Sequence, residues 1–201
     1  MSRSQRLLPY RRSIAAFATI VFAAYATMIP IGAVTSVSGS AANAQTLAPV
    51  KIGAPAPDIA FTAVDGTERW LSEFRGQPVM LWFYASWCPT CQVGTVAVAE
   101  KLERLKQAGI QIIQLQLYNN LGAPGPPVED FAKRYTGSLG PSSNWLWGEA
   151  SLVASYTYDP SGYPDIYFLI GRDGIVQEIA PAPHVTMNII LEFAESAKVS
   201  G

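Results

Sequence analysis

The chain contains two cysteines, Cys88 and Cys91, which stand three positions apart in the segment FYASWCPTCQVG. Two thiols at this spacing can bind a metal ion, close a structural disulfide or exchange electrons with another disulfide. A disulfide between them closes only a small loop, which would add little stability through chain entropy. A structural zinc site usually needs four ligands, and the single histidine, His184, lies far along the chain. The spacing therefore favours thiol-disulfide exchange without a metal or another cofactor.

Cys88 is predicted to lie where a buried strand ends and a helix begins. The apolar run at 78–85 has the length of a strand buried on both faces, and a helix-forming segment starts at Pro89, where the missing N–H is no loss. Unpaired N–H groups at a helix start favour negative charge, so the pKa of the Cys88 thiol should be lowered. Cys91 lies about one turn further along this predicted helix. We therefore expect the exposed Cys88 to attack a partner disulfide and Cys91 to resolve the mixed disulfide.

The elements that would position this pair alternate between strands and helices along the chain. The helix after Pro89 is expected to extend to about residue 107, before Gly109, with one apolar face formed by Val96, Ala99, Leu102 and Leu105. The other predicted elements are a hairpin at 59–74, strands at 78–85 and 110–117, helices at 128–135, 149–156 and 185–198, and a second hairpin at 165–180. This order implies an α/β fold with a central mixed sheet flanked by helices.

The charge is unevenly distributed between the start of the chain and the rest. Residues 1–50 contain four arginines and no acidic residue, whereas the remaining ten basic and fifteen acidic residues give the rest a formal charge of −5. An acidic globular part argues against nucleic acid as a partner, because phosphate binding needs basic patches.

Residues 1–44 have the pattern of an export signal. A basic start precedes an apolar run at 13–34, and small residues up to Ala44 fit a cleavage site that would leave Gln45 as the new N-terminus. The alternative is an uncleaved membrane anchor, because the apolar run is nearly long enough to span a bilayer. Both interpretations place the rest, a lead-in at 45–57 and one domain at 58–201, outside the cytoplasm, periplasmic or secreted.

The motif WCPTC after VMLWFYAS, preceded by IGAPAPDIAFTAVDG and WLSEFRGQPV, resembles a known family. It is similar to the periplasmic and membrane-associated thioredoxin-like thiol-disulfide oxidoreductases (the TlpA, ResA and DsbE group, related to AhpC/TSA proteins), which serve cytochrome c maturation and similar tasks. The segment SGYPDIYFLIGRDGIV is a second point of resemblance. The implied fold is thioredoxin-like with an N-terminal β-hairpin extension. The implied site consists of Cys88, Cys91 and Pro164, with supporting positions at Trp87, Pro89, Thr90, Tyr163 and Asp165.

The resemblance also implies a cis peptide bond between Tyr163 and Pro164 that faces the cysteines. Relatives carry an acid either six residues before the first cysteine or three residues after the second, and this chain has Trp82 and Gly94 there. The usual proton acceptor for the second cysteine is therefore missing at both places. Asp165 is the candidate substitute, with a solvated residue at a strand edge as the alternative.

The resemblance implies an enzyme that reduces disulfides in partner proteins and receives electrons from a membrane protein. A thiol peroxidase of the peroxiredoxin type is one alternative, although Leu81 and Ala85 occupy the positions where those enzymes have proline and threonine. The second alternative is a copper-delivery module that uses Cys88, Cys91 and His184. Two tryptophans in NWLWG are interpreted as packing residues in preference to a docking patch.

Overall fold

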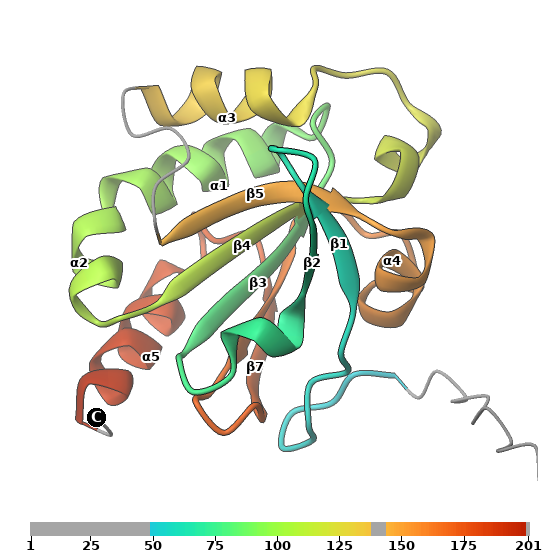
Figure 1. Ribbon diagram of the computed structural model, residues 1–201. Coiled ribbons are helices and arrows are strands. Elements are labelled where there is room, and N and C mark those ends of the chain that lie inside the picture. The colour runs from blue at the N-terminus through green and yellow to red at the C-terminus, as the bar shows by residue number, and fades with distance from the viewer. Residues whose placement is uncertain (1–48, 138–143, 200–201) are drawn as a thin grey trace, which may run out of the picture. The chain divides into compact units, whose positions relative to one another are not determined.

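The computed structural model describes residues 49–137 and 144–199 (Figure 1). The predicted signal peptide or anchor at 1–44 lies outside this part of the chain. Within the described ranges, the helices are all too short or too polar to cross a membrane. The described end of the lead-in runs against the last strand: the Gly53 N–H donates to the Val176 carbonyl at 2.7 Å, and the Val176 N–H donates to the Ala54 carbonyl at 2.9 Å.

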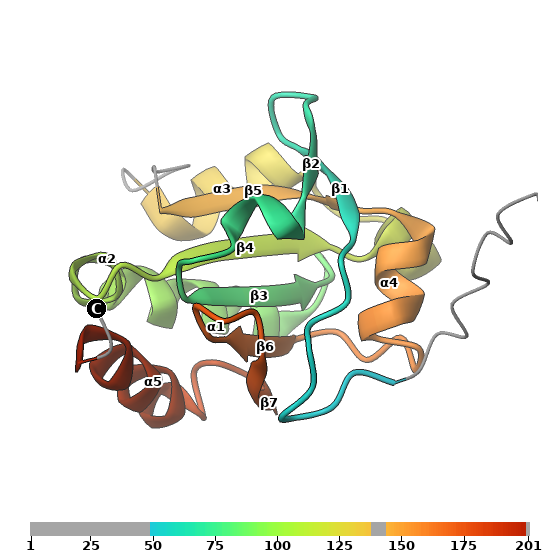
Figure 2. The same cartoon turned by 60° about the horizontal axis from the view of Figure 1, so that its bottom comes forward.

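A mixed sheet with the strand order β2-β1-β5-β4-β3-β6-β7 forms the centre of this part (Figures 1 and 2). β3, β4 and β5 are parallel neighbours, and the other pairs are antiparallel. The strands are β1 Ala60–Ala63, β2 Glu68–Trp70, β3 Val79–Tyr84, β4 Gln111–Gln116, β5 Trp145–Ala150, β6 Ile166–Ile170 and β7 Val176–Pro181. The sheet confirms the predicted α/β class, both hairpins and the buried strand before the cysteines.

Helices cover both faces of the sheet. The α-helices are α1 Pro89–Glu100, α2 Leu102–Gln107, α3 Val128–Thr136, α4 Leu152–Tyr158 and α5 Met187–Val199, and the 3₁₀ turns are η1 Leu71–Phe74 and η2 Tyr118–Gly122. Side chains of α1, α2, α3 and α5 pack on one face, against Met80, Trp82 and Tyr84 of β3. Side chains of η1 and α4 pack on the other face, against Leu81 and Phe83. β3 is therefore buried on both faces, as its continuous apolar run predicts.

The helix after the cysteines differs from the prediction in two respects. It is interrupted at Lys101, whose backbone angles (φ −104°, ψ 2°) end α1 before α2 begins. The predicted apolar face is also partly wrong, because Val96 is exposed and Val98 is buried in its place. α1 therefore turns Cys91, Gly94, Thr95 and Val98 toward the sheet.

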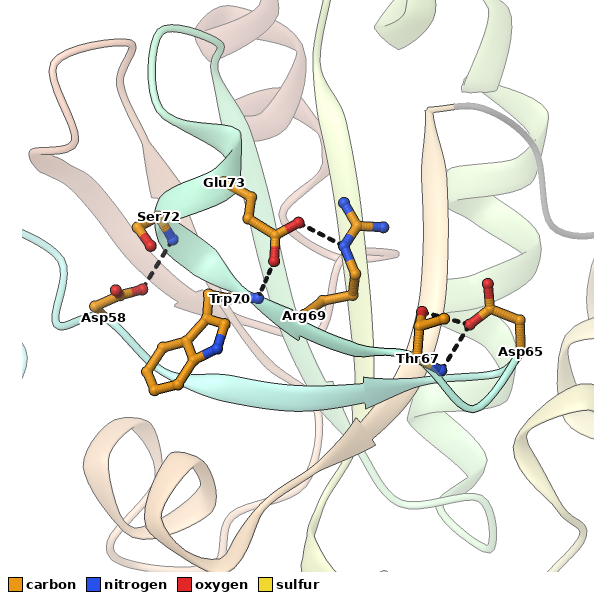
Figure 3. Close-up of polar contacts among 7 residues, drawn as sticks. All are labelled: Asp58, Asp65, Thr67, Arg69, Trp70, Ser72 and Glu73. Atoms are coloured by element: carbon orange, nitrogen blue, oxygen red, sulfur yellow. Dashed lines mark hydrogen bonds and ion pairs between the residues drawn. The ribbon is translucent and has the colours of Figure 1, made fainter.

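Side-chain hydrogen bonds fix the N-terminal hairpin and the turn that follows it (Figure 3). Asp65 accepts hydrogen bonds from the backbone N–H and the hydroxyl of Thr67, at 3.0 and 2.6 Å, across the predicted turn. The Glu73 carboxylate accepts from the Trp70 N–H and from Arg69, both at 2.6 Å, at the start of η1. These local bonds fix the turn between β1 and β2 and the start of η1 after β2.

Candidate active site

Cys88 is the N-cap residue of α1, four residues after β3 ends at Tyr84. Its Sγ atom accepts a hydrogen bond from the Cys91 N–H at 3.3 Å, and the Thr90 hydroxyl lies 3.1 Å from the same sulfur. Both cysteines are free thiols, so the structure shows the dithiol form. Cys88 is less exposed than the sequence predicts, because only 4% of its surface is accessible, whereas Cys91 has none.

The two thiols have opposite electrostatic surroundings. The pKa of Cys88 is lowered most by the hydrogen bond with the Cys91 thiol, and further by the Thr90 hydroxyl and the Cys91 N–H. Burial acts in the opposite direction, and the resulting pKa is about 6. Burial raises the pKa of Cys91 far above its usual range, and the hydrogen bond with Cys88 and the charge of Asp165 raise it further. Cys88 is therefore the thiolate near neutral pH, and Cys91 keeps its proton.

Asp165 lies beside the thiols and is buried, with 1% of its surface exposed. A carboxylate oxygen of Asp165 and both sulfur atoms all lie within 4.8 Å of one another. The Trp82 indole N–H donates to Oδ1 at 3.1 Å, whereas Oδ2 has no hydrogen-bond partner. Burial raises the pKa of Asp165, and Thr90, Trp82 and His184 oppose this effect. The alternative of a solvated residue at a strand edge is therefore wrong.

Trp82 fills the space that an acid in α1 would need. A Cβ atom added to Gly94 would lie 3.1 and 3.3 Å from two atoms of the Trp82 ring, and 3.4 Å from Pro183. Trp82 itself has no exposed surface, and its only polar atom points to Asp165. The two departures from the family pattern, Trp82 and Gly94, are therefore adjacent in the structure. With no acid at either position, Asp165 is the carboxylate beside the thiols.

The expectation of a cis peptide bond at Tyr163–Pro164 is wrong, because this bond is trans. The chain changes direction one residue later, at Asp165, whose φ of 76° lies in the left-handed region. Asp165 is held there by its N–H, which donates to the Phe83 carbonyl at 3.1 Å, and by its carbonyl, which accepts from the Ala182 N–H at 2.8 Å. Pro164 is half-buried, and the Tyr163 side chain is exposed.

The other predicted supporting residues surround the start of α1. Pro89 occupies the first helical position and is exposed, as is Thr90. The Trp87 side chain is 39% exposed, and its indole N–H donates to the Asn120 carbonyl at 2.9 Å. Asn120 was not identified from the sequence, where its loop reads only as a connector rich in glycine and proline.

Sequence reasoning also missed a buried polar chain behind Cys91. The Thr95 hydroxyl donates to the Cys91 carbonyl at 2.8 Å, the Gln114 amide donates to Thr95 Oγ1 at 3.1 Å, and the Trp145 indole donates to Gln114 Oε1 at 3.2 Å. All four residues have no exposed surface. The interpretation of Trp145 as a packing residue is therefore confirmed, and Trp147 is likewise buried. Polar residues in the strand at β4 were the available signal.

The residues that could bind a metal ion differ from the predicted set of Cys88, Cys91 and His184. Among the described residues, the close group of potential ligands consists of Cys88, Cys91 and Asp165, and His184 is not in it. The three ligand atoms are one short of the four that structural zinc sites use.

Comparison with known proteins relates the chain to one redox family. Residues 52–135 match the AhpC/TSA family. The thiol-disulfide oxidoreductase ResA of Geobacillus kaustophilus is 35% identical over 43% of this chain, which spans about half (47%) of that relative. ResA of Bacillus thuringiensis is 30% identical over 65% of this chain and 70% of its own length. The peroxiredoxin Bcp of Escherichia coli is 28% identical over 65% of this chain and 85% of its own length.

A solved structure agrees with the fold. The putative thiol:disulfide interchange protein DsbE from Chlorobium tepidum superimposes with a TM-score of 0.57 at 23% identity, over 74% of this chain and 99% of that one. At this identity the likeness shows the thioredoxin-like fold alone. The family is shown by the ResA relatives, and the paired cysteines agree with it. The chain belongs to the ResA-like family of thioredoxin-fold thiol-disulfide oxidoreductases.

Proposed function

We propose that this protein is a thiol-disulfide oxidoreductase that reduces disulfides in partner proteins with the Cys88–Cys91 pair. The observation that carries the proposal is the asymmetry of the two thiols. Cys88 is ionised near neutral pH at the start of α1, with a pKa of about 6, whereas the buried Cys91 is protonated. A reactive thiolate beside a protonated thiol is the arrangement that exchange through a mixed disulfide needs.

The reaction proceeds in two balanced steps. The Cys88 thiolate attacks one sulfur of the partner disulfide, the partner's S–S bond breaks, and the partner's other sulfur leaves as a thiolate. Cys91 then loses its proton and attacks the Cys88 sulfur, which displaces the partner's second thiolate. The products are a Cys88–Cys91 disulfide and a partner dithiol, so two electrons have moved to the partner.

Asp165 is the proposed acceptor of the Cys91 proton in the second step. Its carboxylate lies within 4.8 Å of both sulfurs and is held by Trp82, and its Oδ2 atom is free to accept. Burial raises its pKa, which makes the carboxylate a stronger base than a solvated aspartate. The proton then passes to the departing partner thiolate. Pro164 and Tyr163 border Asp165 and are proposed to flank the bound substrate.

We place the protein outside the cytoplasm, either released after cleavage of residues 1–44 or anchored by residues 13–34. The basic start and the apolar run support this location. A dithiol that stays reduced in an oxidising compartment needs a supply of electrons, for which we propose a membrane protein. Reduction of haem-attachment cysteines during cytochrome c maturation is one task of this kind, and the identity of the substrate rests on the family resemblance alone.

The proposal is tested by mixing the reduced protein with insulin and trapping intermediates. Cys91→Ser is expected to accumulate a mixed disulfide through Cys88, because attack proceeds and resolution does not. Cys88→Ser should accumulate little, because the buried Cys91 is protonated and inaccessible. Equal trapping by both variants would contradict the roles. A reduction potential of the pair near that of strong oxidants would overturn the direction of transfer.

A thiol peroxidase is the second candidate, favoured by the match to the AhpC/TSA family and by the similarity to the peroxiredoxin Bcp. Leu81 in β3 stands where those enzymes have a proline, and Ala85, directly after β3, lacks the hydroxyl that their threonine supplies three residues before the reactive cysteine. We expect hydrogen peroxide consumption with a thiol donor to stay at background. Rapid consumption that Cys88→Ser abolishes would favour the peroxidase.

A further inference from the structure

The loop after β4 contacts the active-site turn that precedes Cys88. The Asn120 side chain is buried, and its Oδ1 atom accepts a hydrogen bond from the Ser86 N–H at 2.9 Å. The carbonyl of the same residue accepts the Trp87 indole N–H at 2.9 Å. Its Nδ2 atom donates to the Ala123 carbonyl at 2.9 Å, which anchors the side chain to its own loop. One residue thus bonds both positions that lead into Cys88.

The backbone of this loop adopts an unusual conformation to make these contacts. Asn119, Asn120 and Leu121 have φ values of 49°, 50° and 57°, three consecutive residues in the left-handed region. Residues other than glycine are disfavoured in this region, and such conformations persist only where surrounding contacts hold them. The left-handed turn places the backbone carbonyl and the side-chain amide of Asn120 on the same side of the loop, where both contact the turn before Cys88.

Gly125 completes the contact from the other end of the loop. A Cβ atom at this position would overlap Ser86 Oγ, and it would lie 2.7 Å from Asn120 Nδ2 and 3.4 Å from the Trp87 backbone nitrogen. Only glycine allows the backbone to come so near. The segment APGPP is therefore more than a stiff connector, because its glycine packs directly against the active-site turn.

We propose that Asn120 is a positioning residue that holds the Ser86–Trp87 turn in place, and thereby sets the alignment of the Cys88 thiol with the start of α1. The Cys88 sulfur depends on this alignment for its contacts with the Cys91 N–H and with Thr90. A turn released from Asn120 lets the sulfur leave these donors, which makes its thiolate less favoured. The consequence for exchange rests on the proposed function, whereas the positioning itself does not.

The test measures the rate at which iodoacetamide alkylates Cys88 in the full chain between pH 5 and 9. Asn119 provides a matched control, because it is exposed, has the same left-handed backbone, and makes no side-chain bond to the active-site turn. Asn119→Gly and Asn120→Gly both relieve the backbone. Only the second removes the two side-chain bonds of Asn120, to the Ser86 N–H and to the Ala123 carbonyl, while the backbone carbonyl that accepts the Trp87 indole N–H remains. Asn120→Gly is expected to lower the alkylation rate at pH 6.5 by about three- to tenfold and to raise the midpoint of the pH profile. Asn119→Gly should leave the pH profile of Cys88 alkylation as it is in the unsubstituted protein.

A second variant approaches the same contact from Gly125. Gly125→Ala pushes the loop away from Ser86 and is expected to shift the profile in the same direction as Asn120→Gly. Thermal unfolding of each variant separates a change in stability from a change in the profile. Identical profiles for Asn120→Gly, Asn119→Gly and the parent would overturn the proposal. Because iodoacetamide reports only on the thiol, a protein that shows the shift but reduces no protein disulfide would refute the proposed function alone.

Discussion

Replacing Asp165 by asparagine is the most informative single change at this site. Asparagine keeps the size of the side chain and an oxygen that can accept the Trp82 indole N–H, now at 3.1 Å from Oδ1. It removes the negative charge and the ability to take a proton. The charge of Asp165 raises the pKa of both thiols, so its loss should lower the pKa of Cys88. The loss of the base should slow the step in which Cys91 resolves the mixed disulfide.

The size of the thiol shift follows from the separation of the charges. Two unit charges 4.8 Å apart, the upper limit here, interact with about 0.9 kcal/mol at a dielectric constant of 80 and about 3.5 kcal/mol at 20. These energies correspond to about 0.6 and 2.5 pKa units. The charge of Asp165 is the smallest of the effects on the pKa of Cys88, and burial raises the pKa of Asp165 itself. We therefore expect a decrease of roughly half a unit from about 6, at the low end of this range.

The assay follows the reaction of the reduced protein with a chromogenic aryl disulfide by stopped flow. Attack by Cys88 releases the first coloured thiolate, and resolution by Cys91 releases the second. In Asp165→Asn the first phase should be about twofold faster at pH 5.5, because more thiolate is present, and the second phase about tenfold slower or more at pH 7. Asp159→Asn is a matched control, because Asp159 is also buried but does not belong to the group around the sulfurs.

The result that would refute this reasoning is equally specific. Superimposable pH profiles of the first phase would mean that the charge of Asp165 does not reach Cys88. Equal rates of the second phase would mean that water, and not Asp165, accepts the Cys91 proton. A slower second phase in Asp159→Asn as well would indicate a general loss of structure in place of a missing base.

Three further predictions concern the surrounding residues. Iodoacetamide should alkylate Cys88 with a midpoint near pH 6. An ordinary thiol with a pKa of about 8.5 has about 30-fold less thiolate at pH 7, so a midpoint above 8 would contradict the lowered pKa of Cys88. Gly94→Glu should lower the free energy of unfolding in urea by about 1–3 kcal/mol, because the new side chain meets the Trp82 ring; unchanged stability would show that the ring can move. Trp82→Phe should lower the free energy of unfolding by about 1–3 kcal/mol, because the buried Oδ1 atom of Asp165 loses the indole N–H donor, and an equally stable variant would argue against that bond.

The strand, the helix start and the order of elements were predictable because each leaves a local pattern. An apolar run that ends in Trp-Cys-Pro specifies both the buried β3 and the N-cap position of Cys88. The break at Lys101 left no such signal, because neither glycine nor proline marks it. The burial of Gln114 was equally hidden, since its partners are Thr95 and Trp145, which come from two other elements.

The position of Asp165 beside the thiols depends on contacts between distant segments. The antiparallel register pairs Phe83 with Ile166, which brings the residue before β6 to the end of β3 where Cys88 follows. The family pattern suggested this neighbourhood correctly but attached it to a cis bond at Pro164. The chain reaches it with a trans bond and a left-handed residue instead. Pattern matching therefore identified the acid and missed the backbone geometry that places it.

The two departures from the family pattern, Trp82 and Gly94, and the acid at Asp165 are best understood as one arrangement. An indole at position 82 occupies the volume beside α1, so a side chain at position 94 would be in tight contact with the Trp82 ring. The same indole brings a single N–H donor, and a buried donor of this kind requires an acceptor. Asp165 supplies that acceptor with one oxygen and leaves its second oxygen unpartnered in the group with both sulfurs. An acid introduced at position 94 would therefore press on the Trp82 ring, which holds Asp165 through its indole N–H. Among the described residues, Asp165 is the carboxylate grouped with both sulfurs, so the packing around Trp82 bears directly on the acid beside the thiols.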